Sequence, residues 1–265
     1  MISTSLGAGD VGEAADTFNM ALILYPRNRR LIAKGKEIPD LYGKPFYDEH
    51  SKGSLRSARI LLSILHRYHD FKSVVDFGAG NGTWLRAASS CGAKELVAIE
   101  GEWVKAYPGK FRGAAYRYAN LNARISVEKK FDLAVSAEVA EHLDPSRGPS
   151  FVADLCRASD VVAFGAGPPR EQGVGHINCR PQSYWIEQFD RRGFTCLDAF
   201  RPAVWYDKRV EPWYRQDMFL FVATRRLRKF ARIPRPSLVN VYHPLMYNQA
   251  VFWDHLKGVI DPRSP

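Results

Sequence analysis

The stretch VVDFGAGNGTW, from Val74 to Trp84, constrains the fold of this chain more than any other feature. An apolar run ends at Asp76, closely spaced glycines follow, and a pattern typical of a helix begins. Glycine permits positive φ angles and lets backbone N–H groups approach a ligand closely. In open α/β sheets, ligands bind beside such loops, at the carboxyl end of a strand and the start of a helix. The stretch therefore predicts an α/β fold with a ligand site at the glycine loop.

A second acid supports this interpretation. Glu100 ends the apolar run ELVAIE, about twenty residues after the glycine loop. At that spacing an acid can accept hydrogen bonds from ribose hydroxyls, so a nucleoside-containing cofactor is expected. The alternative, a surface turn followed by an unrelated acid, is disfavoured by the spacing and by the strand and helix that flank the loop. Dinucleotide-binding loops carry a third glycine that lets the helix pack closely on the strand, whereas Trp84 stands in that neighbourhood here.

From Ser54 onward, apolar segments of strand type alternate with segments of helical periodicity. Strands separated by helices form a mostly parallel sheet that is covered on both faces. The sequence thus predicts a Rossmann-like, seven-stranded α/β sheet with helices on both faces and an antiparallel last strand. Strands are expected at residues 73–78, 95–100, 114–121, 131–138, 160–167, 194–201 and 217–226. Helices are expected at residues 54–69, 81–92, 148–159 and 181–193.

Three parts of the chain are expected to differ in organisation. Residues 1–53 are predicted to form an N-terminal arm and cap with a short helix at 14–24, residues 54–224 the main domain, and residues 225–265 a basic and aromatic C-terminal extension. No apolar run reaches the roughly 18–20 residues that cross a bilayer, and the acidic N-terminus does not read as a signal peptide. We therefore expect a cytoplasmic protein without a transmembrane segment. The four scattered cysteines disfavour a disulfide framework or a structural zinc site.

Four short segments resemble motifs of the class I S-adenosylmethionine-dependent methyltransferases. They are VVDFGAGNGTWL, AIEGEWV, ANLN and FDLAVSAEVAEHL. The resemblance implies S-adenosylmethionine as the cofactor, with Glu100 at its ribose, Asn120 and Leu121 at its adenine, and Ser136 at its methionine portion. It also implies that the glycine loop holds the aminoacyl end. The loop residues concerned are Asp76, Gly78, Ala79, Gly80 and Gly82.

The segment SAEVAEHL carries two carboxylates and an imidazole, on Glu138, Glu141 and His142. On a helical turn these positions, i, i+3 and i+4, share one face. The methyltransferase resemblance places them beside the methyl group that is transferred. Three hypotheses stay open: an ordinary helix start whose acids are favoured by the helix dipole, a metal site, and a general base.

The metal hypothesis joins Glu138, Glu141 and His142 to a later histidine, His176, as ligands of Mg²⁺ or Mn²⁺. The E-x-x-E-H pattern resembles that of small-RNA 2′-O-methyltransferases, which hold a divalent ion in this way, and that of ubiquinone-pathway O-methyltransferases. The metal-free hypothesis assigns catalysis to His176, His142 and Glu138, because a neutral histidine can accept the proton of an attacking hydroxyl. His176 follows the fifth predicted strand, so it can face His142 at one edge of the sheet.

The acceptor is expected to be a hydroxyl of a sugar, a glycan or another small molecule. The segments GHINCRPQSYWIEQFDRRGF and VEPWYRQDMFLFVATR resemble those of bacterial glycan-modifying methyltransferases. Trp205, Trp213 and Tyr214 can stack on a sugar ring and Arg215 can pair with a phosphate or carboxylate, whereas Trp185 is expected in the core. The net charge of +10 keeps RNA open as an acceptor of a metal-dependent 2′-O-methyltransferase. A third possibility is a scaffold that binds S-adenosylmethionine without catalysis.

Overall fold

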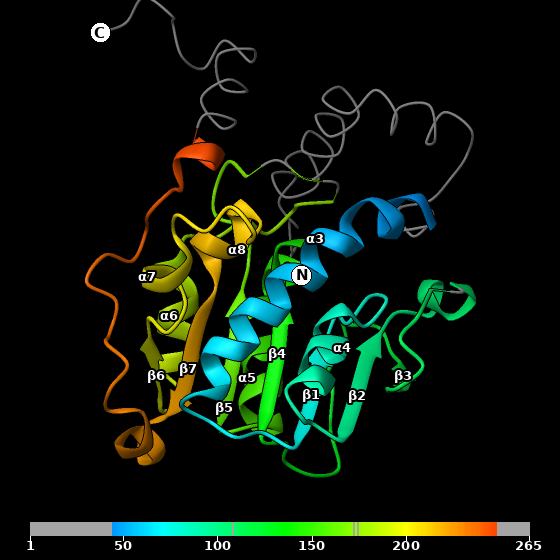
Figure 1. Cartoon of the computed structure of the whole chain (residues 1–265), viewed down its shortest axis with the longest axis horizontal. Coiled ribbons are helices and arrows are strands. Elements are labelled where there is room, and N and C mark those ends of the chain that lie inside the picture. The colour runs from blue at the N-terminus through cyan, green and yellow to red at the C-terminus, as the bar shows by residue number, and fades with distance from the viewer. Residues whose placement is uncertain (1–43, 108, 172, 174, 248–265) are drawn as a thin grey trace, which may run out of the picture.

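A seven-stranded sheet forms the centre of the protein (Figure 1). The computed structural model describes residues 44–107, 109–171, 173 and 175–247. The strands are β1 Ser73–Phe77, β2 Glu95–Glu100, β3 Ala115–Tyr118, β4 Leu133–Ala137, β5 Val161–Gly165, β6 Phe194–Leu197 and β7 Phe219–Ala223. Their order in the sheet is β3-β2-β1-β4-β5-β7-β6, and β7 runs antiparallel to both of its neighbours. The predicted fold class is therefore confirmed.

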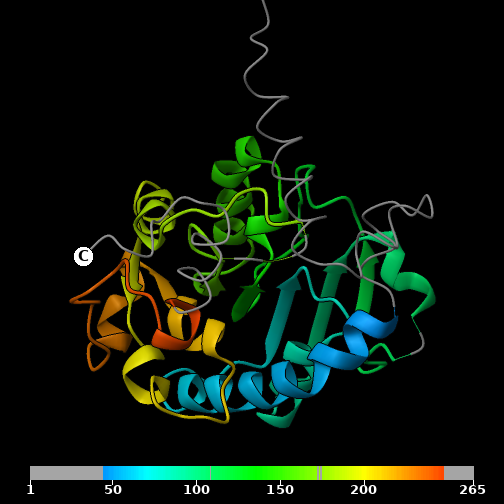
Figure 2. The same cartoon turned by 90° about the horizontal axis from the view of Figure 1, so that it is seen from above.

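Helices cover both faces of this sheet (Figures 1 and 2). The α-helices are α3 Lys44–His66, α4 Thr83–Ser90, α5 Gly148–Ala158, α6 Gln182–Asp190, α7 Arg201–Val204 and α8 Pro212–Asp217. The 3₁₀ helices are η2 Glu102–Ala106, η3 Ala140–His142, η4 Pro145–Arg147 and η5 Thr224–Phe230. Successive strand residues point to opposite faces, so Val74 packs on the side of α3 and α4 whereas Val75 packs on the side of α5 and α6.

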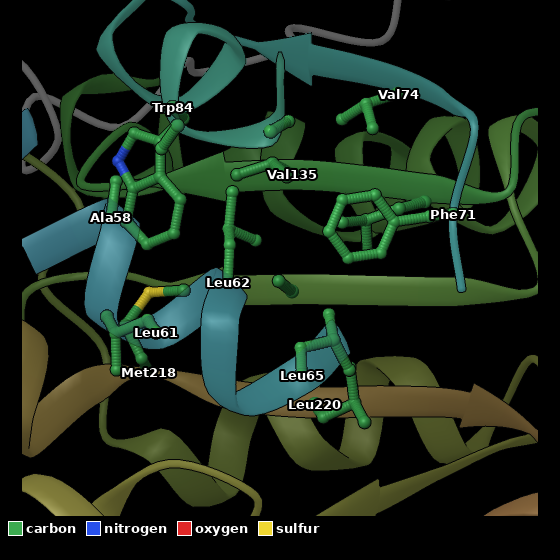
Figure 3. Close-up of a cluster of buried hydrophobic side chains, with 14 of the residues drawn as sticks. Ala58, Leu61, Leu62, Leu65, Phe71, Val74, Trp84, Val135, Met218 and Leu220 are labelled. Atoms are coloured by element: carbon green, nitrogen blue, oxygen red, sulfur yellow. The ribbon is translucent and has the colours of Figure 1, made fainter. Parts of the chain in front are cut away.

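Helix α3 supplies much of the core on its face of the sheet (Figure 3). Its residues Ala58, Leu61, Leu62 and Leu65 recur at helical spacing and are fully buried. They belong to the same apolar cluster as the strand residue Val135. Fully burying one such leucine contributes roughly 1.5–3 kcal/mol, so this contact fixes the helix on the sheet.

The beginning of α3 differs from the prediction. The helix starts at Lys44, whereas the sequence predicted a start at Ser54. Gly53 obscured the earlier turns, because a glycine inside a helix costs about 1 kcal/mol relative to alanine. A Cβ at this position would lie 2.2 Å from Oε1 of Glu211, so a larger residue would require the Glu211 side chain to move. The helix therefore continues across the predicted boundary between residues 53 and 54, and the domain limits themselves remain predictions.

Part of the predicted C-terminal extension packs on the main domain. The N–H of Asp198 donates to the carbonyl of Pro234 over 2.8 Å, and buried Arg201 donates to the carbonyl of Val239 over 3.2 Å. The hydroxyl of Tyr242 donates to the carbonyl of Pro169. The predicted helix at 14–24 and residues 248–265 lie outside the described residues. Within the described part of the chain, no helix has the length and apolar composition that a bilayer crossing requires.

Candidate functional site

The glycine loop after β1 adopts a conformation that requires glycine. Gly78, Gly80 and Gly82 have φ angles of 82°, 52° and 83°, all in the left-handed region. A Cβ on Gly78 would lie 2.3 Å from Cγ2 of Val139, so a larger residue also has no room. The N–H of Gly78 donates to the carbonyl of Ile99 over 2.9 Å, which ties the loop to β2. The loop is thus fixed between the carboxyl ends of β1, β2 and β4.

Glu100 lies against this loop, as its spacing predicted. One carboxylate oxygen of Glu100 accepts a hydrogen bond of 2.7 Å from the N–H of Gly80. The other oxygen accepts one of 2.7 Å from the N–H of Gly101. Burial raises the pKa of Glu100 despite these two donors. The predicted ribose-binding acid and the predicted glycine loop therefore form one unit.

Two polar groups under the loop are buried without a partner. Oδ2 of Asp76 and Oγ of Ser136 have no hydrogen-bond partner among the described residues. They come from neighbouring strands, since Asp76 of β1 pairs with Val135 of β4. Burial and the nearby Glu100 raise the pKa of Asp76 well above its usual range. A buried unsatisfied polar atom costs about 1–3 kcal/mol, so these oxygens fit the polar end of a cofactor. The residues present at this loop therefore fit S-adenosylmethionine.

The predicted adenine segment follows β3. Asn120 is exposed, and its side-chain oxygen accepts a hydrogen bond of 2.9 Å from the N–H of Asn122. Leu121 is buried, and its carbonyl accepts a hydrogen bond of 2.9 Å from Nε of Arg147. Arg147 is buried as well and pairs with the buried carboxylate of Asp154. Arg147 and Asp154 therefore hold the adenine segment in place, a role that sequence reasoning missed.

A cavity of about 430 Å³ opens beside the glycine loop. Helix α3, the loop, helix α4 and the segment after η2 all contribute to its walls. Its lining residues are Ser51, Lys52, Leu55, Asn81, Thr83, Arg86, Tyr107 and Gly109. Helix α3, whose first turns belong to the predicted cap, therefore borders the predicted cofactor site.

The turn after β4 is not the helix start that the sequence suggested. Glu138 has a φ of 59°, a left-handed value that is uncommon for residues other than glycine. Its N–H donates to the carbonyl of Gly165 over 3.0 Å, which continues the contact between β4 and β5. Only then does the 3₁₀ turn η3 contain Glu141 and His142. The condition for a shared helical face is therefore not met, because Glu138 lies before the 3₁₀ turn.

The structure brings His176 against His142. Their rings meet edge to face with centroids 4.7 Å apart. The loop that carries His176 is held to η3, because the N–H groups of Ile177 and Asn178 both donate over 2.9 Å to the carbonyl of Glu141. One ligand atom each of Glu141, His142 and His176 lies within 4.8 Å of the others. We name these three residues the histidine group.

Burial sets the charge state of the histidine group. Glu141 is 0% exposed, neither of its carboxylate oxygens has a hydrogen-bond partner among the described residues, and burial raises its pKa. Burial and the adjacent His142 lower the pKa of His176 to about 3. His176 is therefore neutral at physiological pH, the form that can ligate a metal, while the same low pKa makes the free imidazole a weak base.

Glu138 joins a different set of side chains. One carboxylate oxygen each of Glu138, Glu171 and Asp217 lies within 4.8 Å of the others. Glu171 comes from the loop after β5, and Asp217 ends α8 just before β7. Sequence reasoning missed Glu171 and Asp217. The signal for Asp217 was the antiparallel last strand, whose amino end lies at the same edge of the sheet as the carboxyl ends of the others. We name these three residues the carboxylate group.

One of the three aromatic residues expected to stack on a sugar is buried in the structure, and so is the arginine expected to pair with an anion. Trp185 is buried in the core, as expected, but Tyr214 is buried too. The hydroxyl of Tyr214 contacts Oγ of Ser54 over 3.2 Å. Arg215 is 5% exposed and donates to the carbonyl of Val210 over 2.6 Å, so it already has an internal partner. Trp205 and Trp213 keep partial exposure.

Comparison with known proteins gives a structural result only. No protein-family model and no curated protein matches the sequence. The solved structure of DesVI from Streptomyces venezuelae is 14% identical, with a TM-score of 0.54 over 71% of this chain and 98% of DesVI. The fold is that of the class I S-adenosylmethionine-dependent methyltransferases.

Other solved structures with this class I fold are also similar to the chain. A S-adenosylmethionine-dependent methyltransferase from Mesorhizobium loti is 17% identical, with a TM-score of 0.45 over 62% of this chain and 94% of that protein. DhpI in complex with S-adenosylhomocysteine is 16% identical, with a TM-score of 0.46 over 78% of this chain and 96% of DhpI.

Proposed function

We propose that this protein transfers the methyl group of S-adenosylmethionine to a hydroxyl of a sugar, a glycan or another small molecule. One observation carries the proposal. The glycine loop with its unpartnered buried oxygens follows β1, and Glu141 and His142 of the histidine group follow β4, which is hydrogen-bonded to β1. A class I fold that joins these two features at one edge has a place for a methyl donor next to groups that can handle a proton.

The cofactor would be held by residues from four strand ends. Glu100 would serve the ribose, Asn120 and Leu121 the adenine, and Ser136 the methionine portion. The aminoacyl end would be held by Asp76, Gly78, Ala79, Gly80 and Gly82. The bound cofactor supplies an activated methyl group. Binding also requires Glu100 to share oxygens that now accept hydrogen bonds from Gly80 and Gly101.

The acceptor hydroxyl must lose its proton as its oxygen bonds to the methyl carbon and the bond from that carbon to sulfur breaks. We assign proton acceptance to His176, with His142 and Glu138 as its catalytic neighbours. His176 is neutral and lies beside His142. The His176 loop is anchored by the carbonyl of Glu141, so the imidazole keeps a defined position. Positioning of this kind supplies a large part of the rate enhancement in transfer reactions.

A second candidate function is metal-dependent 2′-O-methylation of RNA. The histidine group offers an oxygen and two imidazoles to one point, a donor set suited to Mg²⁺ or Mn²⁺. Of the four ligands that the sequence suggested, three belong to this group and Glu138 to the other. A bound ion would lower the pKa of the acceptor hydroxyl. The net charge of +10 suits a polyanionic acceptor.

The first experiment measures S-adenosylmethionine binding to the full chain by calorimetry. Binding in the micromolar range is expected. If no binding is detected, both enzymatic candidates are refuted, and a scaffold that does not bind S-adenosylmethionine is what is left. The second experiment follows S-adenosylhomocysteine release with separate panels of sugars, glycans and short RNAs. Turnover with RNA alone would replace the first candidate by the second. Activity that survives a chelator in full would remove the metal requirement.

A further inference from the structure

We propose that the carboxylate group, Glu138, Glu171 and Asp217, is a binding site for a divalent cation that is separate from the histidine group. Its ligands are carboxylate oxygens only. Such a set suits hard cations such as Mg²⁺, Mn²⁺ or Ca²⁺, which prefer oxygen ligands. This proposed ion site is distinct from both the glycine loop and the histidine group.

Three elements converge to form this group. Glu138 follows β4, Glu171 lies in the loop after β5, and Asp217 ends α8. Their ligand oxygens lie within 4.8 Å of one another, a separation that donors around a single ion can have. The two groups adjoin at Gly167, where a Cβ would lie 3.4 Å from Oε2 of Glu171 and 3.5 Å from Cε1 of His176.

Two oxygens of the group are buried and unsatisfied. Oε1 of Glu138 and Oε2 of Glu171 have no hydrogen-bond partner among the described residues. Glu141 of the adjoining histidine group is likewise 0% exposed, and neither of its oxygens has a hydrogen-bond partner among the described residues.

The neighbouring charges leave room for a cation. The hydrogen bonds to Asp217 come from the neutral side-chain amides of Gln182 and Gln216 and not from a Lys or Arg side chain. An ionised carboxylate buried without a counter-charge costs several kcal/mol. Three carboxylates exceed the charge of an ammonium ion by two and that of a divalent ion by one. A divalent cation is therefore the better match.

Asp217 is also oriented as a metal ligand requires. The side-chain amides of Gln182 and Gln216 donate to its two oxygens over 2.5 and 3.3 Å. Gln216 is itself fixed, because its amide oxygen accepts a hydrogen bond of 2.7 Å from the N–H of His243. Hydrogen bonds to ligating carboxylates typically change metal affinity by 10–100-fold. The C-terminal segment around His243 thus helps to position the site.

The test is a Mn²⁺ titration of the chelator-treated full chain, followed by calorimetry and by the EPR signal of free Mn²⁺. The carboxylate group is expected to contribute about one bound ion per chain to the wild type. Glu171→Gln and Asp217→Asn are each expected to bind about one ion fewer than the wild type. His176→Ala is expected to keep the ion of the carboxylate group. No methyl donor or acceptor is present, so the outcome is separate from the test of methyl transfer.

Matched controls are the exposed acids Glu128→Gln and Asp190→Asn, which should bind as the wild type does. Circular dichroism and thermal unfolding establish that each variant is folded. If Asp217→Asn does not fold, Glu171→Gln, whose residue lies in a loop, tests the site instead. Unchanged binding by Glu171→Gln would overturn the proposal. So would the loss of all Mn²⁺ in His176→Ala, because that result requires one shared site, and so would a wild type that binds no Mn²⁺.

Discussion

The pKa values of acidic residues shift in opposite directions at the two edges of the sheet. At the amino ends of the parallel strands, Asp132 accepts hydrogen bonds from the N–H groups of Lys72 and Ser73, which outweigh burial and lower its pKa. At the carboxyl ends, burial raises the pKa of every acid discussed above. These acids are Asp76, Glu100, Glu138, Glu141, Glu171 and Asp217.

The difference separates carboxylates that are satisfied within the fold from the carboxylates that we propose bind ligands. Asp132 is satisfied by donors that fold with it, so its charge stabilises the start of β1. Asp76, Glu138 and Glu171 each have a buried oxygen without a hydrogen-bond partner among the described residues. Such an unsatisfied oxygen lowers the stability of the folded protein. Strongly perturbed acids gathered in one place are typical of ligand and catalytic sites. The carboxyl edge of the sheet is thus distinguished by buried carboxylate oxygens that have no hydrogen-bond partner among the described residues.

The largest effect is expected from Gly78→Ala. The left-handed φ costs alanine about 1–2 kcal/mol, and the added Cβ would also meet Val139. The loop must shift, and a shift of about 1 Å can cost ~100-fold, so S-adenosylmethionine affinity should fall by at least that factor. Calorimetry measures the affinity and thermal unfolding measures the stability.

Gly193→Ala is the matched control, because Gly193 has a φ of 73° and nothing within 4 Å of its Cβ position. It should lose a similar 1–2 kcal/mol through backbone strain and bind the cofactor normally. Equal cofactor affinity in the two variants would show that the shape of the glycine loop does not matter for binding.

The next effect is expected from His176→Ala and His142→Ala. Removal of a general base typically slows turnover by 10²–10⁴-fold, while the cofactor site around Glu100 stays intact. We expect that loss in turnover with cofactor affinity changed less than about twofold. His69→Ala is the control, since His69 contacts Asp132 at the opposite edge. Full turnover in both site variants would remove the histidines from the chemistry.

The sequence predicted that the glycine loop and Glu100 lie together, but it predicted the carboxylate group only in part. The glycine loop and Glu100 form a local pattern, because a strand, a loop and a helix follow one another directly. Glu171 and Asp217 meet Glu138 only through the pairing of β5 with β7, which no local pattern encodes. The positive φ of Glu138 likewise depends on its contact with β5. Periodicity predicted the strands and core helices well, and failed where Gly53 masked the start of α3.

Charge neutralisation should change stability in opposite directions at the two edges. The pKa of Asp76 is raised above its ordinary 3.8, so its contribution to stability is present below pH 3.8 and is lost as the pH rises through the folded value. Asp76→Asn should therefore stabilise the cofactor-free protein at pH 8 by about 1 kcal/mol and match the wild type near pH 4.

Asp132→Asn should do the reverse. The pKa of Asp132 is lowered below 3.8, so its contribution is present above pH 3.8 and is lost as the pH falls through the folded value. The variant should lose about 1 kcal/mol at pH 7, and the difference should vanish at low pH. Chemical denaturation across this pH range measures the free energy of unfolding of both variants. Changes of the same sign in the two variants would refute the proposed difference between the acids of the two edges.

The smallest effect is expected from Asp160→Asn, also at the amino edge. Asp160 pairs with Lys130 and, over 2.6 Å, with Arg225 of the basic C-terminal run. The side chains of both cations are more than half exposed, at 52% and 65%, and exposed ion pairs are worth about 0.2–1 kcal/mol. The variant should lose no more than that, and the loss should shrink in high salt because screening weakens the pairs. Thermal unfolding at low and high salt measures it, with Asp190→Asn as the unpaired control. A larger, salt-independent loss would mean that Asp160 anchors η5 through more than charge, and that the amino edge also contains an acid on which the packing of the C-terminal segment depends.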